Sequence, residues 1–155
     1  MSTHARGWSL VAVQAVLLVG LVLLARRSPS APSLVVGIAL VAAGAVLLVT
    51  SFRRLGNALT ATPVPIEGAG LRTGGAYAWV RHPIYSAVLL MVLGYLVAVG
   101  SGWGWAWGGL IVIFFWAKSR WEDRLLADEY GAQWVQWSRS TGALVPRIGR
   151  RRSPQ

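Results

Sequence analysis

The chain has 155 residues, of which 55% are hydrophobic and only 13% are charged, whereas a soluble domain carries about 25% charged residues. It contains no cysteine, which excludes disulfides, thiolate metal sites and cysteine nucleophiles. The net charge of +10 would suit nucleic-acid binding, but the basic residues lie at the ends of long apolar runs, as in membrane proteins. We therefore expect an all-α polytopic membrane protein that binds neither nucleic acid nor a metal.

Four apolar runs predict about four transmembrane helices. They extend from Trp8 to Leu24, from about Leu34 to Val49, from Ile84 to Val99 and from about Trp103 to Ala117. Each run lies near the lower limit of the ~17–25 residues that cross a bilayer. Gln14 is the only strongly polar side chain among them. A cleaved signal peptide is the alternative for the first run, but its apolar stretch exceeds the usual ~7–15 residues, which favours a retained span.

The distribution of charge predicts the orientation. Four spans place both termini on one side, together with the long loop between the second and third spans. That side receives nearly all the basic residues, and the other receives only Arg26 and Arg27, so the positive-inside rule places the first side in the cytoplasm. All five acidic residues also lie there. We expect a bacterial inner membrane or plasma membrane, with the active site on the cytoplasmic face.

The long loop between the second and third spans, Leu55 to Tyr85, is rich in glycine and proline, which disfavours a regular helix through most of it. It ends in Arg81-His82-Pro83 at the start of the third span. Proline suits the first turn of a helix, whose free N–H groups bind polar or anionic groups, and the two preceding side chains add donors. The structural alternative is a snorkelling arginine beside an interfacial histidine.

The segment from Lys118 to Trp137 predicts an amphipathic helix that continues the fourth span and is broken near Gly131. Lys118 and Glu122 are four residues apart and therefore share a face close to the bilayer edge, where charges tend to be functional. The alternative is a surface helix with a modest intrahelical ion pair. Between the third and fourth spans, Gly100 to Trp107 is expected to turn the chain, with its tryptophans as interfacial anchors.

Taken in order, these segments resemble the isoprenylcysteine carboxyl methyltransferase family. The pattern is Leu55-Gly, Leu59-Thr, Pro63-x-Pro65 and Leu71-x-Thr-x-Gly-x-Tyr77-x-x-x-Arg-His-Pro-x-Tyr85, then Lys118-x-x-x-Glu-Asp-x-x-Leu126-x-x-x-Tyr-Gly, and finally Val145-Pro146. We therefore divide the chain into a pair of transmembrane helices (1–54), a methyltransferase core (55–146) and a basic tail expected to be disordered (147–155). The first two spans carry no family signal.

The resemblance implies a membrane methyltransferase that uses S-adenosylmethionine and acts on a lipophilic small-molecule or prenylated acceptor in the lipid bilayer. Arg81, Lys118 and Glu122 are implied to be catalytic, and Lys118 stands where eukaryotic members have an arginine that engages substrate. Besides Lys118, two positions depart from the family, namely Ala87 in place of a common glycine and Asp123 in place of a glutamate. The implied cofactor contacts are Ala69, Gly70, Leu71, Arg72, Tyr77, His82, Pro83, Ile84, Tyr85 and Glu122.

The chemistry of the acceptor favours a carboxylate. A carboxylate is already ionised at neutral pH, whereas an amine or phenol needs a base, for which His82 is the one motif residue whose ordinary pKa lies near neutrality. This chemistry suits the O-methylation of the isoprenylcysteine type that the resemblance implies. Two alternatives stay open: an NADPH-dependent enzyme similar to the sterol reductases, and a non-catalytic membrane scaffold.

Overall fold

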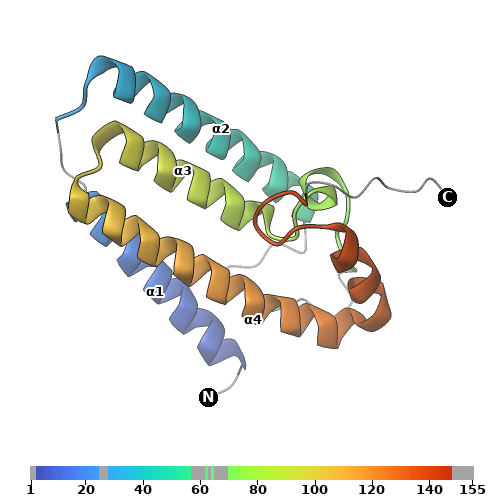
Figure 1. The fold of residues 1–155 in the computed structure, drawn as a ribbon. Helices are drawn as coiled ribbons and strands as arrows, with labels where there is room; N and C mark the ends of the chain where they lie inside the picture. Colours follow the sequence, from blue (N-terminus) through green and yellow to red (C-terminus); the bar gives the residue numbers. More distant parts are fainter. Residues whose placement is uncertain (1–2, 25–27, 57–61, 63, 65–69, 148–155) are drawn as a thin grey trace.

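The computed structural model describes residues 3–24, 28–56, 62, 64 and 70–147, and within these residues the fold is all-helical, as predicted. Its long helices run between two ends of the molecule (Figure 1). One end carries the α1–α2 and α3–α4 connections, and the other carries a short 3-10 helix, the start of α3 and the last part of α4. The elements are α1 (Thr3–Leu24), α2 (Ala31–Leu55), η2 (Gly75–Ala78), α3 (Pro83–Val99) and α4 (Gly102–Ser140).

The helices extend beyond the apolar runs that predict them. α1 begins five residues before Trp8, and α2 continues to Leu55, with Arg53 and Arg54 in its last turn, where cations suit the helix dipole. The turn expected over Gly100 to Trp107 is shorter than predicted, because only Gly100 and Ser101 lie between α3 and α4. Ser101 caps α4 by accepting a hydrogen bond from the Gly104 amide at 3.1 Å, so the tryptophans belong to the first turns of α4.

Among the residues that the structure describes, two helices, α1 and α2, are long and apolar enough to cross a membrane, judged by length and composition. Most of their residues are exposed, unlike those of a core helix in a soluble protein. α3 is apolar but has only 17 residues. The four-span arrangement therefore stays a prediction where α3 and α4 are concerned.

Small residues bring α2 and α3 into close contact. A Cβ atom on Gly94 would lie 2.7 Å from the carbonyl oxygen of Gly37, and one on Gly44 would lie 2.9 Å from that of Ala87. Glycine and alanine allow such approach between membrane helices, whose packing energy comes from direct contact. The Ala87 departure is thus accommodated, because the residue opposite it on α2 is a glycine.

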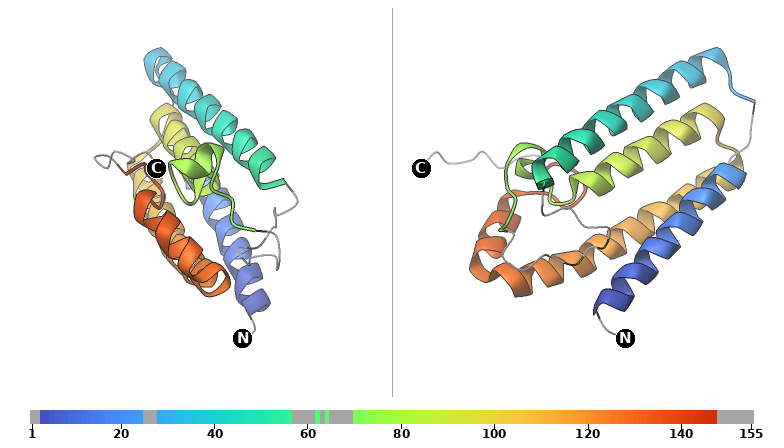
Figure 2. Two further views of the ribbon diagram at one scale, coloured as in Figure 1. Left: turned by 90° about the vertical axis from the view of Figure 1, so that its right-hand side faces the viewer. Right: turned by 180° about the vertical axis from the view of Figure 1, so that it is seen from behind.

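The remaining helices are joined by an apolar core and by several hydrogen bonds, among them one of 2.8 Å from the Ser101 hydroxyl to the Leu24 carbonyl at the end of α1. The Trp107 indole on α4 donates to the Leu17 carbonyl on α1 at 2.8 Å. Figure 2 shows that α1 and α4 lie together near the end of α1 and diverge toward the N-terminus. The core residues come from α1, α3 and α4: Leu21, Val92, Leu96, Ile111 and Phe115.

The predicted break near Gly131 is confirmed as a kink inside α4. Gly131 has a φ of 51°, a conformation that glycine adopts without strain, and the chain turns back there toward the start of α3. After α4, Gly142 forms a parallel bridge with Val80, and the Arg81 amide donates to the Gly142 carbonyl at 2.8 Å. The C-terminal segment is thereby fastened to the turn that precedes α3. Residues 148–155 of the predicted tail lie outside the described residues.

Candidate active site

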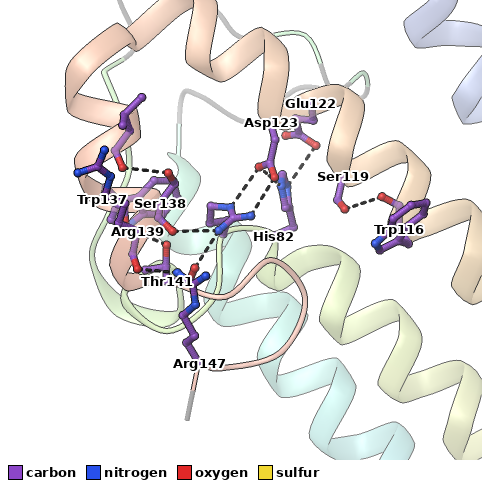
Figure 3. A network of polar contacts seen from close by, with 12 residues as sticks. His82, Trp116, Ser119, Glu122, Asp123, Trp137, Ser138, Arg139, Thr141 and Arg147 are labelled. Carbon is purple, nitrogen blue, oxygen red and sulfur yellow. Dashed lines mark hydrogen bonds and ion pairs between the residues drawn. The ribbon is translucent and has the colours of Figure 1, made fainter. Parts of the chain in front are cut away.

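His82 lies at the centre of a cluster that joins α3 to α4. It is the N-cap residue of α3, and only 4% of it is exposed. Its Nε2 lies 2.8 Å from Asp123 Oδ1, and its Nδ1 lies 3.4 Å from Glu122 Oε2 (Figure 3). Two consecutive carboxylates on α4 therefore contact the two nitrogens of one ring.

Arg81 binds Asp123 from another side. Its Nε and Nη2 donate to the two carboxylate oxygens at 3.2 and 3.0 Å. Its Nη1 donates to the carbonyl oxygens of Ser138 and Thr141 at 3.1 and 2.8 Å, and the guanidinium lies 5.8 Å from the Trp134 ring. The donors of Arg81 are thus directed at the chain itself, and they hold the kinked end of α4 against the turn before α3.

The charges in this cluster stabilise one another. Burial disfavours a charged imidazole, but Glu122 and Asp123 outweigh that effect and raise the pKa of His82 to about 9. Burial alone would raise the pKa of Asp123, but hydrogen bonds from His82 and Arg81 hold it below its ordinary value. At neutral pH, His82 is therefore an imidazolium and Asp123 a carboxylate.

Two tyrosines lie against Glu122. The Tyr85 hydroxyl donates to Glu122 Oε2 at 2.6 Å, and the Tyr85 ring stacks on His82 with centroids 5.4 Å apart. Tyr77 is buried in η2, and burial together with the charge of Glu122 raises the pKa of its phenol well above the usual range. The side chain of Glu122 is 22% exposed, which makes it more accessible than its neighbour Asp123.

Lys118 lies one helical turn before Glu122, but the two form no ion pair. Its Nζ donates to the Oε1 of Gln14 on α1 at 2.6 Å and lies 4.9 Å from the centre of the Tyr85 ring. Lys118 is only 4% exposed. Within the part of the chain that the structure describes, this buried ammonium has no carboxylate within ion-pair distance.

The other predicted cofactor residues occupy two places. Pro83 and Ile84 form the first turn of α3 directly beside His82. Gly70, Leu71 and Arg72 lie in the segment before η2, and Arg72 is close enough to Tyr130 for its charge to act on that phenol. Ala69 lies outside the described residues.

Sequence reasoning missed two partners in this cluster. Asp123 entered only as a departure from a motif, yet it binds both Arg81 and His82. Gln14 did carry a signal, because an amide inside an apolar run needs a hydrogen-bond partner, but the sequence does not say which one. Among the residues that the structure describes, no group of histidines and carboxylates is arranged to hold a metal ion.

The chain matches the phospholipid methyltransferase family over residues 32–133, from the first turn of α2 to just beyond the Gly131 kink. This family comprises membrane methyltransferases of the isoprenylcysteine carboxyl methyltransferase type, so the resemblance seen in the sequence is confirmed. No curated protein matches the chain. Helix α1 lies outside the matched region.

Proposed function

Because the chain belongs to the phospholipid methyltransferase family, whose members are membrane enzymes that use S-adenosylmethionine, we propose that it methylates a carboxylate on a lipophilic acceptor. One observation carries the choice of acceptor. The buried ammonium of Lys118 has no carboxylate within ion-pair distance in the described chain, and it lies one helical turn from Glu122, the accessible carboxylate of the site.

Glu122 is well suited to hold the cofactor. S-adenosylmethionine, when bound, supplies the methyl group on a sulfonium, and it also presents an ammonium and a carboxylate. Tyr85 and His82 both contact Oε2 of Glu122, and no described residue bonds to Oε1, which can accept from that ammonium. The proposal assigns the remaining cofactor contacts to Tyr77, to the first turn of α3 and to residues 69–72.

The protonation state of the site favours a carboxylate acceptor. An amine or phenol must lose a proton before it attacks, and His82, with its pKa of about 9, already holds its proton at neutral pH. A carboxylate needs no base, and the Lys118 ammonium attracts it. The family description names phospholipids, so methylation of a phospholipid amine is the second candidate.

The residues orient the reactants for an in-line displacement. S-adenosylmethionine, when bound, would supply its methyl group to a carboxylate oxygen of the acceptor and would leave as the neutral thioether, with the sulfur keeping the electron pair of the broken carbon–sulfur bond. No proton is transferred, and the product is a methyl ester. Lys118 and Glu122 hold the two reactants, whereas Arg81 acts as a positioning residue, because its donors bind Asp123 and two backbone carbonyls.

The cellular placement follows from helices and charge together. We propose four membrane spans, with both termini and the site on the cytoplasmic side, because described basic residues such as Arg53, Arg54 and Arg81 lie at the helix ends on the side of the site. Short as it is, α3 can cross the bilayer together with its neighbours, since a hydrophobic stretch below the bilayer thickness is accommodated at modest cost.

Membranes containing the protein, incubated with S-adenosylmethionine labelled in its methyl group, test the proposal. We expect a labelled lipophilic product that releases volatile methanol in alkali, because methyl esters hydrolyse and N-methyl amines do not. Glu122→Gln should weaken binding of the demethylated cofactor by about tenfold or more, since a charge-assisted hydrogen bond is lost. Glu129→Gln, at an exposed acid of the same helix, is the matched control and should bind normally.

The other outcomes are distinct. If the label lies in a phospholipid headgroup and is stable to alkali, the methyl acceptor is an amine and not a carboxylate. Binding of NADPH without S-adenosylmethionine would indicate a reductase, and binding of neither would indicate a scaffold.

A further inference from the structure

Gln14 is the one strongly polar side chain in the apolar run of α1, and an unpaired amide in such surroundings is costly. It accepts a 2.6 Å hydrogen bond from Lys118 Nζ. The two residues are 104 positions apart, and α1 lies outside the region that matches the family. A helix without family signal therefore supplies a polar group directly to the candidate site.

The surroundings of Lys118 are otherwise aromatic. Its Nζ lies 4.9 Å from the centre of the Tyr85 ring, 5.9 Å from that of Phe114 and 5.8 Å from that of Phe115. An ammonium has three N–H donors, and the Gln14 oxygen takes one of them. In the described chain, the direct contacts of this buried cation are a neutral amide and ring faces, while Glu122 acts on it from beyond ion-pair distance, so the site favours an incoming anion.

The geometry of a carboxylate poses a further requirement. Its two oxygens are best held by two donors side by side, which arginine provides in a rigid fork and lysine does not. The NH₂ group of Gln14 shares its amide carbon with the oxygen that Lys118 holds, so it lies beside the ammonium. Within the described chain, no hydrogen bond engages that NH₂ group.

We propose that Gln14 and Lys118 together form a two-point site for the acceptor carboxylate, one donor from α1 and one from α4. The pair replaces the fork of a single arginine, and α1 forms one wall of the acceptor site. This inference rests on the proposed function, because it takes the acceptor to be a carboxylate.

The test compares two probes that differ only in this group, N-acetyl-S-farnesylcysteine and its methyl ester. Their binding to the full chain in detergent, saturated with the demethylated cofactor, is measured by calorimetry. We expect the wild type to prefer the acid by about tenfold or more, and Gln14→Leu to lose most of that preference. Lys118→Arg introduced into Gln14→Leu should restore it, because the arginine supplies both donors.

Two controls separate recognition from folding. Binding of the demethylated cofactor reports whether each variant is folded, and Val16→Leu, at an exposed position of α1, should keep the wild-type preference. If Gln14→Leu does not fold, Gln14→Glu decides: it keeps the shape of the side chain but neutralises Lys118, so the preference for the acid should disappear.

The inference is overturned if Gln14→Leu or Gln14→Glu keeps the wild-type preference, or if the arginine fails to restore it. The proposed function fails separately, if the wild type forms no methyl ester from the acid. If the preference for the acid depends on Gln14 but no methyl ester forms, the two-point binding site is supported and only the proposed reaction is contradicted.

Discussion

At the residue scale, the site is organised around a buried imidazolium. His82 lies between Asp123 and Glu122, and Arg81 completes the cluster by binding Asp123. Burying charges costs solvation energy, which is recovered only when every charge has a partner in good geometry. Each member of this cluster therefore depends on the others, and removing one leaves a buried charge uncompensated.

The raised pKa of His82 predicts how stability depends on pH. In the folded state the imidazole keeps its proton up to about pH 9, whereas the unfolded chain loses it near the ordinary histidine pKa of 6.5. The stabilisation is therefore fully present below pH 6.5 and is lost as the pH rises through about 9. Thermal unfolding in detergent should show a Tm that falls by several degrees over this interval.

Histidine variants provide the control for this pH dependence. His82→Gln should flatten the profile between these pH values, because no proton is then taken up on folding at this position. His4→Gln, at an exposed position near the start of α1, should keep the wild-type slope. A slope that survives in His82→Gln would assign the titration to another group.

At the element scale, the contact between α2 and α3 fixes where the site begins. Gly37 and Gly44 on α2 allow the backbone of α3 to approach at Gly94 and Ala87. Ala87 lies one turn beyond Pro83, so the same contact that holds α3 also holds the His82 turn. The motif therefore depends on glycines of α2, a helix that lies within the region matching the family although its apolar run contains no motif residue.

This packing predicts opposite effects for two glycine substitutions. Gly94→Ala places a Cβ 2.7 Å from the Gly37 carbonyl oxygen and 2.8 Å from the Val41 amide, so the helices must separate, at a cost of about 1–3 kcal/mol. Gly109→Ala in α4 meets no atom within 4 Å and should be neutral or should stabilise the helix by up to ~1 kcal/mol. Denaturant unfolding of the two variants measures the difference, and equal destabilisation would contradict the close contact.

At the scale of the whole molecule, the two ends differ in chemistry. One end carries only short connections between helices, whereas the other carries η2, the start of α3 and the kinked end of α4. The charged cluster lies at the second end, as do Arg53 and Arg54 in the last turn of α2 and Arg139 in the last turn of α4. This asymmetry is the physical basis for the proposed orientation in the membrane.

Because the chain has no cysteine, single introduced cysteines report the orientation directly. Thr73→Cys lies before η2 and Ser28→Cys lies between α1 and α2, and both positions are exposed. In a bacterial host, a membrane-impermeant maleimide should label Ser28→Cys in spheroplasts and Thr73→Cys only in inverted vesicles. The reverse pattern would show that the topology is opposite to the one proposed. Labelling of both cysteines from the same side would contradict an odd number of membrane crossings between the two positions.

The sequence alone predicted the helices and named several residues that the structure brings together. Apolar runs, the proline at the start of α3 and the glycine at the kink are local signals, because helix formation depends on neighbours within a few residues. The family motif also predicted that His82, Tyr85, Lys118 and Glu122 lie in one active site. The structure brings these four into contact, while their roles in catalysis remain proposals.

The tertiary structure decided which partner each charged group has. Lys118 and Glu122 share a helix face, yet they do not pair with each other. Lys118 donates a hydrogen bond to Gln14, whereas Glu122 contacts His82 and Tyr85. Arg81 binds Asp123, which the sequence marked only as a departure. Charges near a membrane bind whichever polar group lies closest in space, and that group can be more than a hundred residues away. The two-point site proposed on α1 and α4 follows from such a contact.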